Sequence, residues 1–176
     1  MADNLAEYIR SIPDFPKPGI LFRDITTLIE NGKGLRRTID ALTAEAKKLG
    51  PIDKVASPEA RGFVFGAPVA AALGSGLILM RKKGKLPCKT VSTVYELEYG
   101  QDEIHIHENS VKPGERILVI DDLLATGGTI DGCCRLLESQ GGKVAGVGFV
   151  IELVDLGGRE KLAGRSVFSL VPFPGH

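Results

Sequence analysis

The sequence has no excess of charge of either sign. Its 22 lysines and arginines balance 22 aspartates and glutamates, so the formal net charge is zero. A neutral chain has no general electrostatic attraction to nucleic acid or to anionic lipid. We therefore expect no nucleic-acid partner and no binding to a membrane surface.

Long apolar runs are missing as well. No run approaches the roughly 18 residues that a membrane-spanning helix needs. The first residues, MADNLAE, have neither the basic part nor the apolar part of a signal peptide. These absences predict a protein that has no signal peptide and no membrane partner.

Cysteine is scarce. The chain has three cysteines, which are Cys88, Cys133 and Cys134. Their number is odd, two are adjacent and no Cys-x-x-Cys spacing occurs, so neither a disulfide framework nor a zinc site fits. We expect reduced thiols, with the adjacent pair on a helix, and therefore a cytoplasmic protein.

The chain does contain a regular alternation of apolar segments. Its 176 residues are 43% hydrophobic, which is enough for a single domain with a sizeable core. Apolar periodicity predicts helices over 34–50, 61–73 and 129–140, the second of them interrupted or kinked at Pro68. It predicts strands over 54–57, 76–80, 116–120, 144–153 and 166–171, and a half-exposed antiparallel hairpin within 82–107. This order favours an α/β fold with a mostly parallel, twisted sheet flanked by helices.

The three histidines carry no metal signature. His105 and His107 alternate with isoleucines on the predicted hairpin, and His176 is the last residue. We interpret all three as surface residues and not as ligands.

The residues after Ile120 are the strongest candidate for a site. Ligands of parallel α/β sheets bind beyond the carboxyl ends of the strands. Asp121 and Asp122 stand at the end of the predicted buried strand, directly after Ile120. Carboxylates repel a phosphate, but they accept hydrogen bonds from the vicinal hydroxyls of a sugar. These two acids therefore indicate a sugar.

The loop that follows has the residues of a phosphate site. Gly127 and Gly128 let backbone amides approach a ligand, and Thr126 and Thr129 add hydroxyl donors. The predicted helix begins at Thr129 and contributes the positive end of its dipole. Together with the preceding acids, this pattern predicts a phosphorylated sugar as the ligand.

Three other phosphate-handling patterns do not match this segment. A Walker A loop ends in Gly-Lys-Ser/Thr, and no lysine is present here. A dinucleotide fingerprint requires Gly-x-Gly-x-x-Gly. An aspartyl-phosphate phosphatase requires acids two residues apart, but position 123 is leucine. The remaining alternative is an ordinary strand-turn-helix with acidic surface residues.

Residues 117–129, ILVIDDLLATGGT, resemble the phosphoribosyl pyrophosphate motif of type I phosphoribosyltransferases. Five further segments resemble the adenine-specific members of that family, and the last of them resembles their bacterial branch. They are 12–26 (IPDFPKPGILFRDIT), 59–63 (EARGF), 81–87 (RKKGKLP), 95–100 (YELEYG) and 169–176 (SLVPFPGH). The resemblance spans nearly the whole chain.

This resemblance implies an enzyme of purine salvage that converts adenine and phosphoribosyl pyrophosphate to AMP and pyrophosphate. It implies one domain over residues 1–176, in which 1–33 form a hood segment that binds the base and 82–107 form a flexible hairpin over the site. It also implies a homodimer, with Arg61 and the region from Phe15 to Arg23 near the interface.

For phosphoribosyl pyrophosphate, the resemblance assigns Asp121 and Asp122 to the ribose hydroxyls. The 5′-phosphate falls to the loop residues Ala125, Thr126, Gly127, Gly128 and Thr129. Negative charge develops on the departing pyrophosphate, and the basic residues that could balance it are Arg61, Arg81, Lys82 and Lys85. Mg²⁺ would bridge pyrophosphate and ribose oxygens, held mainly through substrate and water. The resemblance also places a non-proline cis peptide near Glu59-Ala60.

For adenine, the resemblance assigns backbone groups around Leu21 and Arg23, with apolar contacts from Phe22 and Leu153. The base loses a proton when it attacks, and Glu98 stands where the family has a general base, beside Tyr99. Closure of the hairpin would exclude water from the site.

Two alternatives stay open at this point. One is a phosphoribosyltransferase for another purine, such as hypoxanthine, guanine or xanthine, which the Phe22-Arg23-Asp24 signature disfavours. The other is a non-catalytic regulator that senses phosphoribosyl pyrophosphate. Such proteins usually add a nucleic-acid-binding part or a basic face, and this neutral chain has no spare length for one.

Overall fold

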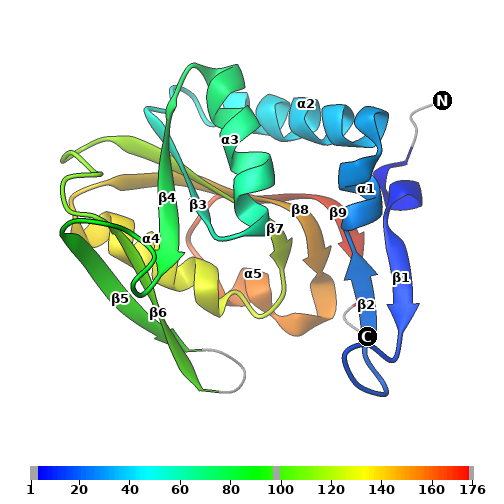
Figure 1. The fold of residues 1–176 in the computed structure, drawn as a ribbon. Helices are drawn as coiled ribbons and strands as arrows, with labels where there is room; N and C mark the ends of the chain where they lie inside the picture. Colours follow the sequence, from blue (N-terminus) through cyan, green and yellow to red (C-terminus); the bar gives the residue numbers. More distant parts are fainter. Residues whose placement is uncertain (1–3, 97–99, 175–176) are drawn as a thin grey trace.

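The computed structural model describes residues 4–96 and 100–174 (Figure 1). Within these residues the main sheet has seven strands in the order β5-β6-β4-β3-β7-β8-β9. Its parallel part contains β3 (Lys54–Pro58), β4 (Gly76–Lys82), β7 (Arg116–Leu124), β8 (Lys143–Leu153) and β9 (Val167–Phe173). The mostly parallel α/β fold predicted from the sequence is confirmed.

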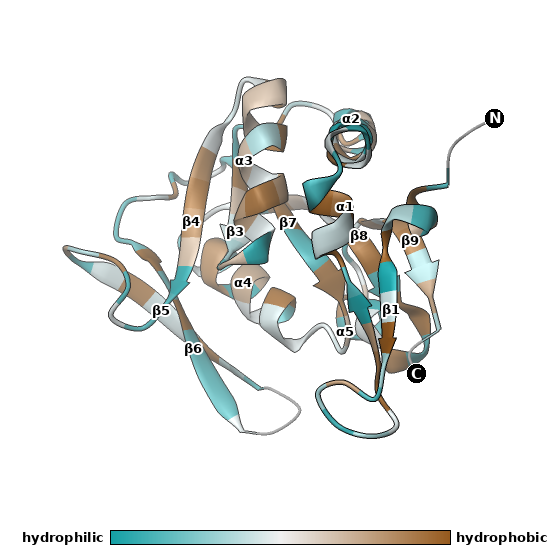
Figure 2. Ribbon diagram, turned by 45° about the vertical axis from the view of Figure 1, so that its right-hand side comes forward, coloured by the Kyte–Doolittle hydropathy of each residue, from teal (hydrophilic) through white to brown (hydrophobic). Residues whose placement is uncertain are grey.

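The other strands pair antiparallel. β6 (Gln101–His107) joins the edge of β4, and β5 (Thr90–Glu96) pairs with β6 to complete the predicted hairpin. A separate two-stranded sheet is formed by β1 (Arg10–Pro13) and β2 (Leu21–Asp24). The hairpin and the β1–β2 pair project from the same end of the main sheet, on opposite sides of it (Figure 2). This is the end at which β4, β7 and β8 finish.

Helices cover both faces of the sheet (Figure 1). One face carries α1 (Thr26–Glu30), α2 (Gly32–Lys48) and α3 (Arg61–Leu73), and the other carries α4 (Gly128–Ser139) and α5 (Gly158–Lys161). Short 3₁₀ helices, η1 (Leu5–Tyr8) and η2 (Val154–Leu156), complete the elements. Each face has its own apolar cluster, one around Phe65 of α3 and Leu42 of α2, the other around Phe149 of β8 and Leu136 of α4.

Local signals explain the helix boundaries. The Asn31 side chain accepts a hydrogen bond from the Gly34 amide at 2.9 Å, so α2 begins two residues before the predicted start. α3 continues through Pro68 to Leu73 and ends at Gly74, whose φ of 67° is left-handed. Cys133 and Cys134 are buried free thiols on α4, as predicted.

Strand β7 is longer than predicted. The sequence indicates a strand that ends at Ile120, but the structure continues it through both acids to Leu124. The reason is pairing with β8, in which Asp121 lies opposite Phe149 and Leu123 opposite Ile151. The acids therefore lie on a paired strand, ahead of the loop.

His105 differs from its predicted surface position. Its side chain is only 12% exposed, because the hairpin packs it beside Thr90 and Glu103. His107 is partly buried, and His176 lies outside the described residues. Among the helices of the described segments, none is long and apolar enough to cross a membrane.

Candidate active site

The loop between β7 and α4 encloses a small cavity of about 100 Å³, which we call the loop cavity. It is lined by Glu96 and by residues of β7, the loop and the start of α4, which are Asp121, Leu123, Leu124, Ala125, Thr126, Gly127, Gly128, Thr129 and Ile130. In the described part of the chain no side chain caps α4, so its first amides remain available to an anion.

Glycines shape this loop. Gly127 has a φ of 81°, which favours glycine, and it precedes the first residue of α4. A Cβ atom at Gly127 would lie 2.9 Å from the Gly158 carbonyl oxygen, so α5 supports the loop closely from behind. A Cβ atom at Gly128 would lie 2.4 Å from the Glu96 carbonyl oxygen, so the end of β5 covers the loop from the front.

The two acids of β7 have different surroundings. Asp122 is buried and forms an ion pair with Arg61, which stands at the start of α3. This pairing raises the pKa of Arg61. Asp121 accepts a hydrogen bond from the Asp122 amide at 2.8 Å. Burial, and then the charge of Asp122, raise the pKa of Asp121 well above its ordinary value.

A second cavity, of about 290 Å³, lies beside these acids and is called here the charged cavity. Residues from β3, α3, β4, β5, β6, β7 and α4 line it, and they are Pro58, Glu59, Ala60, Arg61, Lys82, Tyr95, Asp102, Asp121, Asp122 and Thr129. The Glu59-Ala60 peptide is cis, as the resemblance predicts. Oppositely charged side chains thus surround a space that is open to a polyanionic ligand.

A third cavity, of about 340 Å³, lies between the β1–β2 pair and the end of the main sheet. We call it the apolar cavity, because most of its lining is Ile12, Phe15, Phe22, Ile25, Leu123 and Ile151. Arg23, Asp24, Thr26, Arg61 and Asp122 complete it. The rings of Phe15 and Phe22 meet edge to face, with 5.1 Å between their centroids. Such a lining suits a flat, mostly apolar group.

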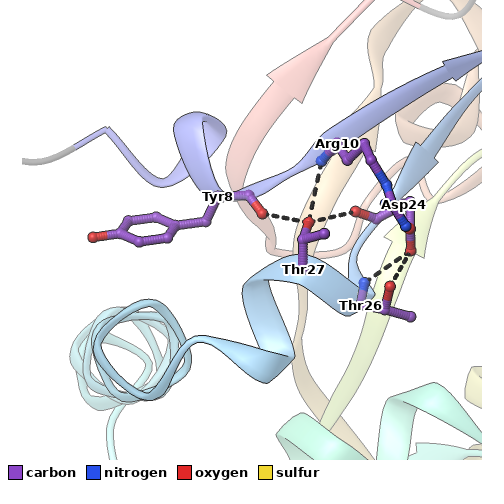
Figure 3. Close-up of polar contacts among 5 residues, drawn as sticks. All are labelled: Tyr8, Arg10, Asp24, Thr26 and Thr27. Carbon is purple, nitrogen blue, oxygen red and sulfur yellow. Dashed lines mark hydrogen bonds and ion pairs between the residues drawn. The ribbon is translucent and has the colours of Figure 1, made fainter.

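Asp24 fixes the β1–β2 pair to the rest of the chain (Figure 3). Its carboxylate accepts hydrogen bonds from the Thr26 hydroxyl at 2.6 Å and from the Thr26 amide at 3.0 Å, and it pairs with Arg10. The Thr27 hydroxyl donates to the Tyr8 carbonyl oxygen at 2.7 Å and accepts from the Arg10 amide at 3.3 Å. The wall of the apolar cavity is therefore tied to α1.

Comparisons with known proteins agree with this geometry. Residues 26–165 match the model of the phosphoribosyl transferase domain. The adenine phosphoribosyltransferase of Escherichia coli O157:H7 is 53% identical over 174 residues, which is 98% of this chain and 94% of that protein. The crystal structure of adenine phosphoribosyltransferase from Thermoanaerobacter pseudethanolicus superimposes with a TM-score of 0.89 at 49% identity, covering 96% of this chain and 98% of that one.

The chain belongs to the adenine phosphoribosyltransferase family. It is therefore a transferase that joins adenine to the phosphoribosyl group of phosphoribosyl pyrophosphate, giving AMP. A further solved relative, from Saccharomyces cerevisiae, is complexed with an imino-altritol bisphosphate and adenine. It has a TM-score of 0.88 and 35% identity, covering 94% of this chain and 98% of that one.

The structure gathers many of the residues predicted for this adenine phosphoribosyltransferase site. All seven residues predicted for the sugar phosphate line the loop cavity or the charged cavity, and so do Arg61 and Lys82. Arg81 and Lys85 do not line these cavities, although Arg81 pairs with Glu59, which does. Phe22 and Arg23 line the apolar cavity, whereas Leu21 and Leu153 do not. Glu98 and Tyr99 lie outside the described residues.

Sequence reasoning missed three charged or polar residues of the charged cavity, which are Glu59, Tyr95 and Asp102. Glu59 and Tyr95 stand at the first position of two segments that resemble the family, EARGF and YELEYG. That position was a usable signal for these two residues. Asp102 had no such signal, because only its pairing opposite Tyr95 brings it to the cavity.

Proposed function

We propose that three adjoining cavities divide the substrates of the transfer to adenine among them. The observation that carries this division is that all three cavities meet at the end of β7. The loop cavity and the charged cavity share Asp121, the charged cavity and the apolar cavity share Asp122, and the loop cavity and the apolar cavity share Leu123. A ribose at this junction would direct its three substituents into three different environments.

The 5′-phosphate belongs in the loop cavity under this proposal. The amides at the start of α4 and the hydroxyls of Thr126 and Thr129 are the donors. Asp121 and Asp122 accept hydrogen bonds from the ribose hydroxyls, and their place on a paired strand holds them rigidly for that role.

The pyrophosphate belongs in the charged cavity, near Arg61 and Lys82, with Arg81 and Lys85 as further cations. Mg²⁺ fits this cavity as an ion carried with the substrate. The carboxylates of Asp121 and Asp122 are hard oxygen donors, but the described residues contain no group of three metal-binding side chains. When bound, the ion would balance charge on the departing pyrophosphate.

Adenine belongs in the apolar cavity. Phe15 and Phe22 offer ring contacts, and backbone groups near Leu21 and Arg23 are the proposed partners of its polar edge. Residues 1–33 would then act as the base-binding hood. Leu153, at the end of β8, is proposed as a further apolar contact.

Glu98 is proposed as the general base that takes the proton of adenine. Support comes from its neighbours in sequence, since Glu96 lines the loop cavity, and Tyr95 and Asp102 line the charged cavity. Residues 82–107 would close over the site and keep water from the activated sugar. The reaction would pass through an oxocarbenium-like ribose, with pyrophosphate leaving as N9 of adenine attacks.

The test is AMP formation from adenine and phosphoribosyl pyrophosphate, with and without Mg²⁺, compared with turnover of hypoxanthine. We expect turnover that depends on the metal and favours adenine. A preference for hypoxanthine would contradict the base assignment. Glu98→Gln should lose turnover while still binding phosphoribosyl pyrophosphate, and an unchanged rate would remove Glu98 from the mechanism.

We also propose a cytoplasmic homodimer. After Arg61, α3 contains no charged residue, yet Ala67, Ala71 and Ala72 are exposed on it. Leu79 of the adjoining β4 is 41% exposed, and Phe15 of the hood is 50% exposed. A second copy of the chain would cover this apolar surface. Sedimentation of the free protein at the mass of one chain would contradict the dimer.

A further inference from the structure

Three cations are paired with carboxylates that line the charged cavity. Arg61 pairs with Asp122, Lys82 with Asp102 at 2.9 Å, and Arg81 with Glu59 at 3.3 Å. A pyrophosphate group that enters this cavity must therefore compete with acids of the protein for each cation. The three acids come from β6, from β7 and from the residue after β3, so the arrangement is not a local feature of one segment.

Two of these acids, Glu59 and Asp102, have a second donor besides the cation. Glu59 accepts a hydrogen bond from the Lys82 amide at 2.6 Å. Asp102 accepts one from the Glu103 amide at 2.8 Å, on Oδ1. Asp122 is the acid proposed to receive ribose hydroxyls. A carboxylate that keeps a donor can release its cation without being left unsatisfied.

Asp102 shows this arrangement most clearly, because two donors share one of its oxygens. Lys82 Nζ lies 2.9 Å from Oδ2, and the Tyr95 hydroxyl lies 3.3 Å from the same atom. Lys82 lowers the pKa of Asp102, so this side chain is a carboxylate at neutral pH. Burial raises the pKa of Tyr95 to about 12, so its hydroxyl keeps its proton and acts as a donor.

Tyr95 is held in place by α4. Its side chain is 4% exposed, and a Cβ atom at Gly132 would lie 2.7 Å from Tyr95 Cβ. Gly128, one turn earlier, faces the Glu96 carbonyl oxygen in the same way. Because Gly128 and Gly132 have no side chains, the end of β5 packs closely against α4 beside the loop cavity. The phenol cannot follow Lys82 when that flexible, half-exposed lysine moves.

We propose that binding of the pyrophosphate group transfers Lys82 from Asp102 to the substrate, and that Tyr95 is a positioning residue that keeps Asp102 hydrogen-bonded after the transfer. The proposal rests on the assignment of the pyrophosphate to the charged cavity. It gives Asp102 a restraining role, since its charge repels the substrate and holds the lysine that the substrate needs.

The experiment is a double-mutant cycle on the full-length protein, with Asp102→Asn, Tyr95→Phe and the double variant. Calorimetry measures the dissociation constants of phosphoribosyl pyrophosphate and of inorganic pyrophosphate, each with Mg²⁺. Asp102→Asn should bind both ligands about two- to fivefold more tightly, because an ion pair of this exposure contributes no more. Tyr95→Phe should bind both about two- to fivefold more weakly, because Asp102 then depends on Lys82.

In the Asp102→Asn background, Tyr95→Phe should have no further effect on binding. Steady-state rates give a second readout, in which the KM for phosphoribosyl pyrophosphate changes and the KM for adenine does not. A merely structural tyrosine would alter both KM values and would act in both backgrounds. Weaker or unchanged binding by Asp102→Asn, or equal effects of Tyr95→Phe in the two backgrounds, would overturn the proposal.

Asp40→Asn is the matched control, since Asp40 forms an exposed ion pair with Arg36 on α2. It removes the same charge away from the cavity and should leave binding unchanged. Tighter binding by this control would show that the gain of Asp102→Asn comes from the change in net charge, and it would overturn the proposed transfer of Lys82. If Tyr95→Phe fails to fold, Lys82→Met replaces it and must abolish the gain of Asp102→Asn. A wild-type protein that binds pyrophosphate but forms no AMP would contradict the proposed function alone.

Discussion

Replacing Asp24 with asparagine tests how the hood is fixed to the rest of the chain. The pKa of Asp24 is lowered from 3.8 to about 2, first by the hydrogen bond from the Thr26 hydroxyl and then by the one from Arg10. Proton linkage makes a difference of this size worth at most about 2.5 kcal/mol. Because Arg10 is 59% exposed, solvent screens its contribution, and we expect a loss of about 1 kcal/mol at pH 7.

The expected loss depends on pH. A carboxyl whose pKa is lowered by folding stabilises the fold above its unfolded-state pKa and loses that effect as pH falls through its folded-state pKa. The window for Asp24 therefore runs from 3.8 down to about 2. The wild-type protein should exceed Asp24→Asn in stability by a constant amount above pH 5, and the difference should shrink below pH 4.

Urea unfolding at a series of pH values from 7 to 3 measures this difference directly. Asp40→Asn, which removes an exposed acid on α2, is the control and should cost less than about 0.5 kcal/mol. Since Asp24 lines the apolar cavity, its replacement should also raise the KM for adenine. A stability difference that stays the same from pH 7 to pH 3 would refute the reasoning.

Three further predictions concern single contacts. Burial, and then the charge of Asp122, raise the pKa of Asp121, so ionisation of this carboxyl destabilises the fold as pH rises above 3.8. Asp121→Asn should therefore unfold at a higher temperature than the wild type at pH 8 and lose that advantage near pH 4. A lower unfolding midpoint than the wild type at pH 8 would contradict this. Gly132→Ala should displace Tyr95 and lower the rate of AMP formation on the order of tenfold, and an unchanged rate would count against seating of the hairpin by α4. Arg159→Ala leaves the buried Glu152 without the cation that donates to it at 2.6 and 2.8 Å. Urea unfolding should show that the free energy of unfolding falls by about 2 kcal/mol, and adding Glu152→Gln in a double variant should recover this stability.

The fold was largely predictable because its signals are local. Apolar runs and helix caps place the strands of the parallel sheet and the helices α2, α3 and α4 to within a few residues, and the alternation of strand and helix implies parallel pairing. The short helices α1 and α5 were not predicted. The short strands β1 and β2 were not predicted, since four residues between prolines and glycines carry no clear period. The predicted end of β7 was wrong for a different reason. A charged side chain is not expected within a buried strand, and Arg61, the cation whose pairing allows Asp122 to be buried, is 61 positions away in the sequence.

The residues of the candidate site also differ in whether the signal for them is local in the sequence. Residues 121–129 form a continuous motif, so the sequence alone indicates that they bind a phosphorylated sugar. The sequence gives no such indication for Asp102, because its importance depends on a pairing register that places it opposite Tyr95 and beside Lys82. The largely covered position of His105 was missed in the same way, since it depends on the pairing of β6 with β5 and β4.

The basic residues show the limit of arguing from residue types alone. Arginines and lysines near a phosphate motif predict a site for an anion, but they do not reveal whether those cations are free. In the structure Arg61, Arg81 and Lys82 each have an acidic partner. If pyrophosphate binds in the charged cavity as proposed, its affinity is a difference between two sets of ion pairs and not a sum of attractions. Removing an acid such as Asp102 can therefore strengthen binding, which the sequence motif by itself would not suggest.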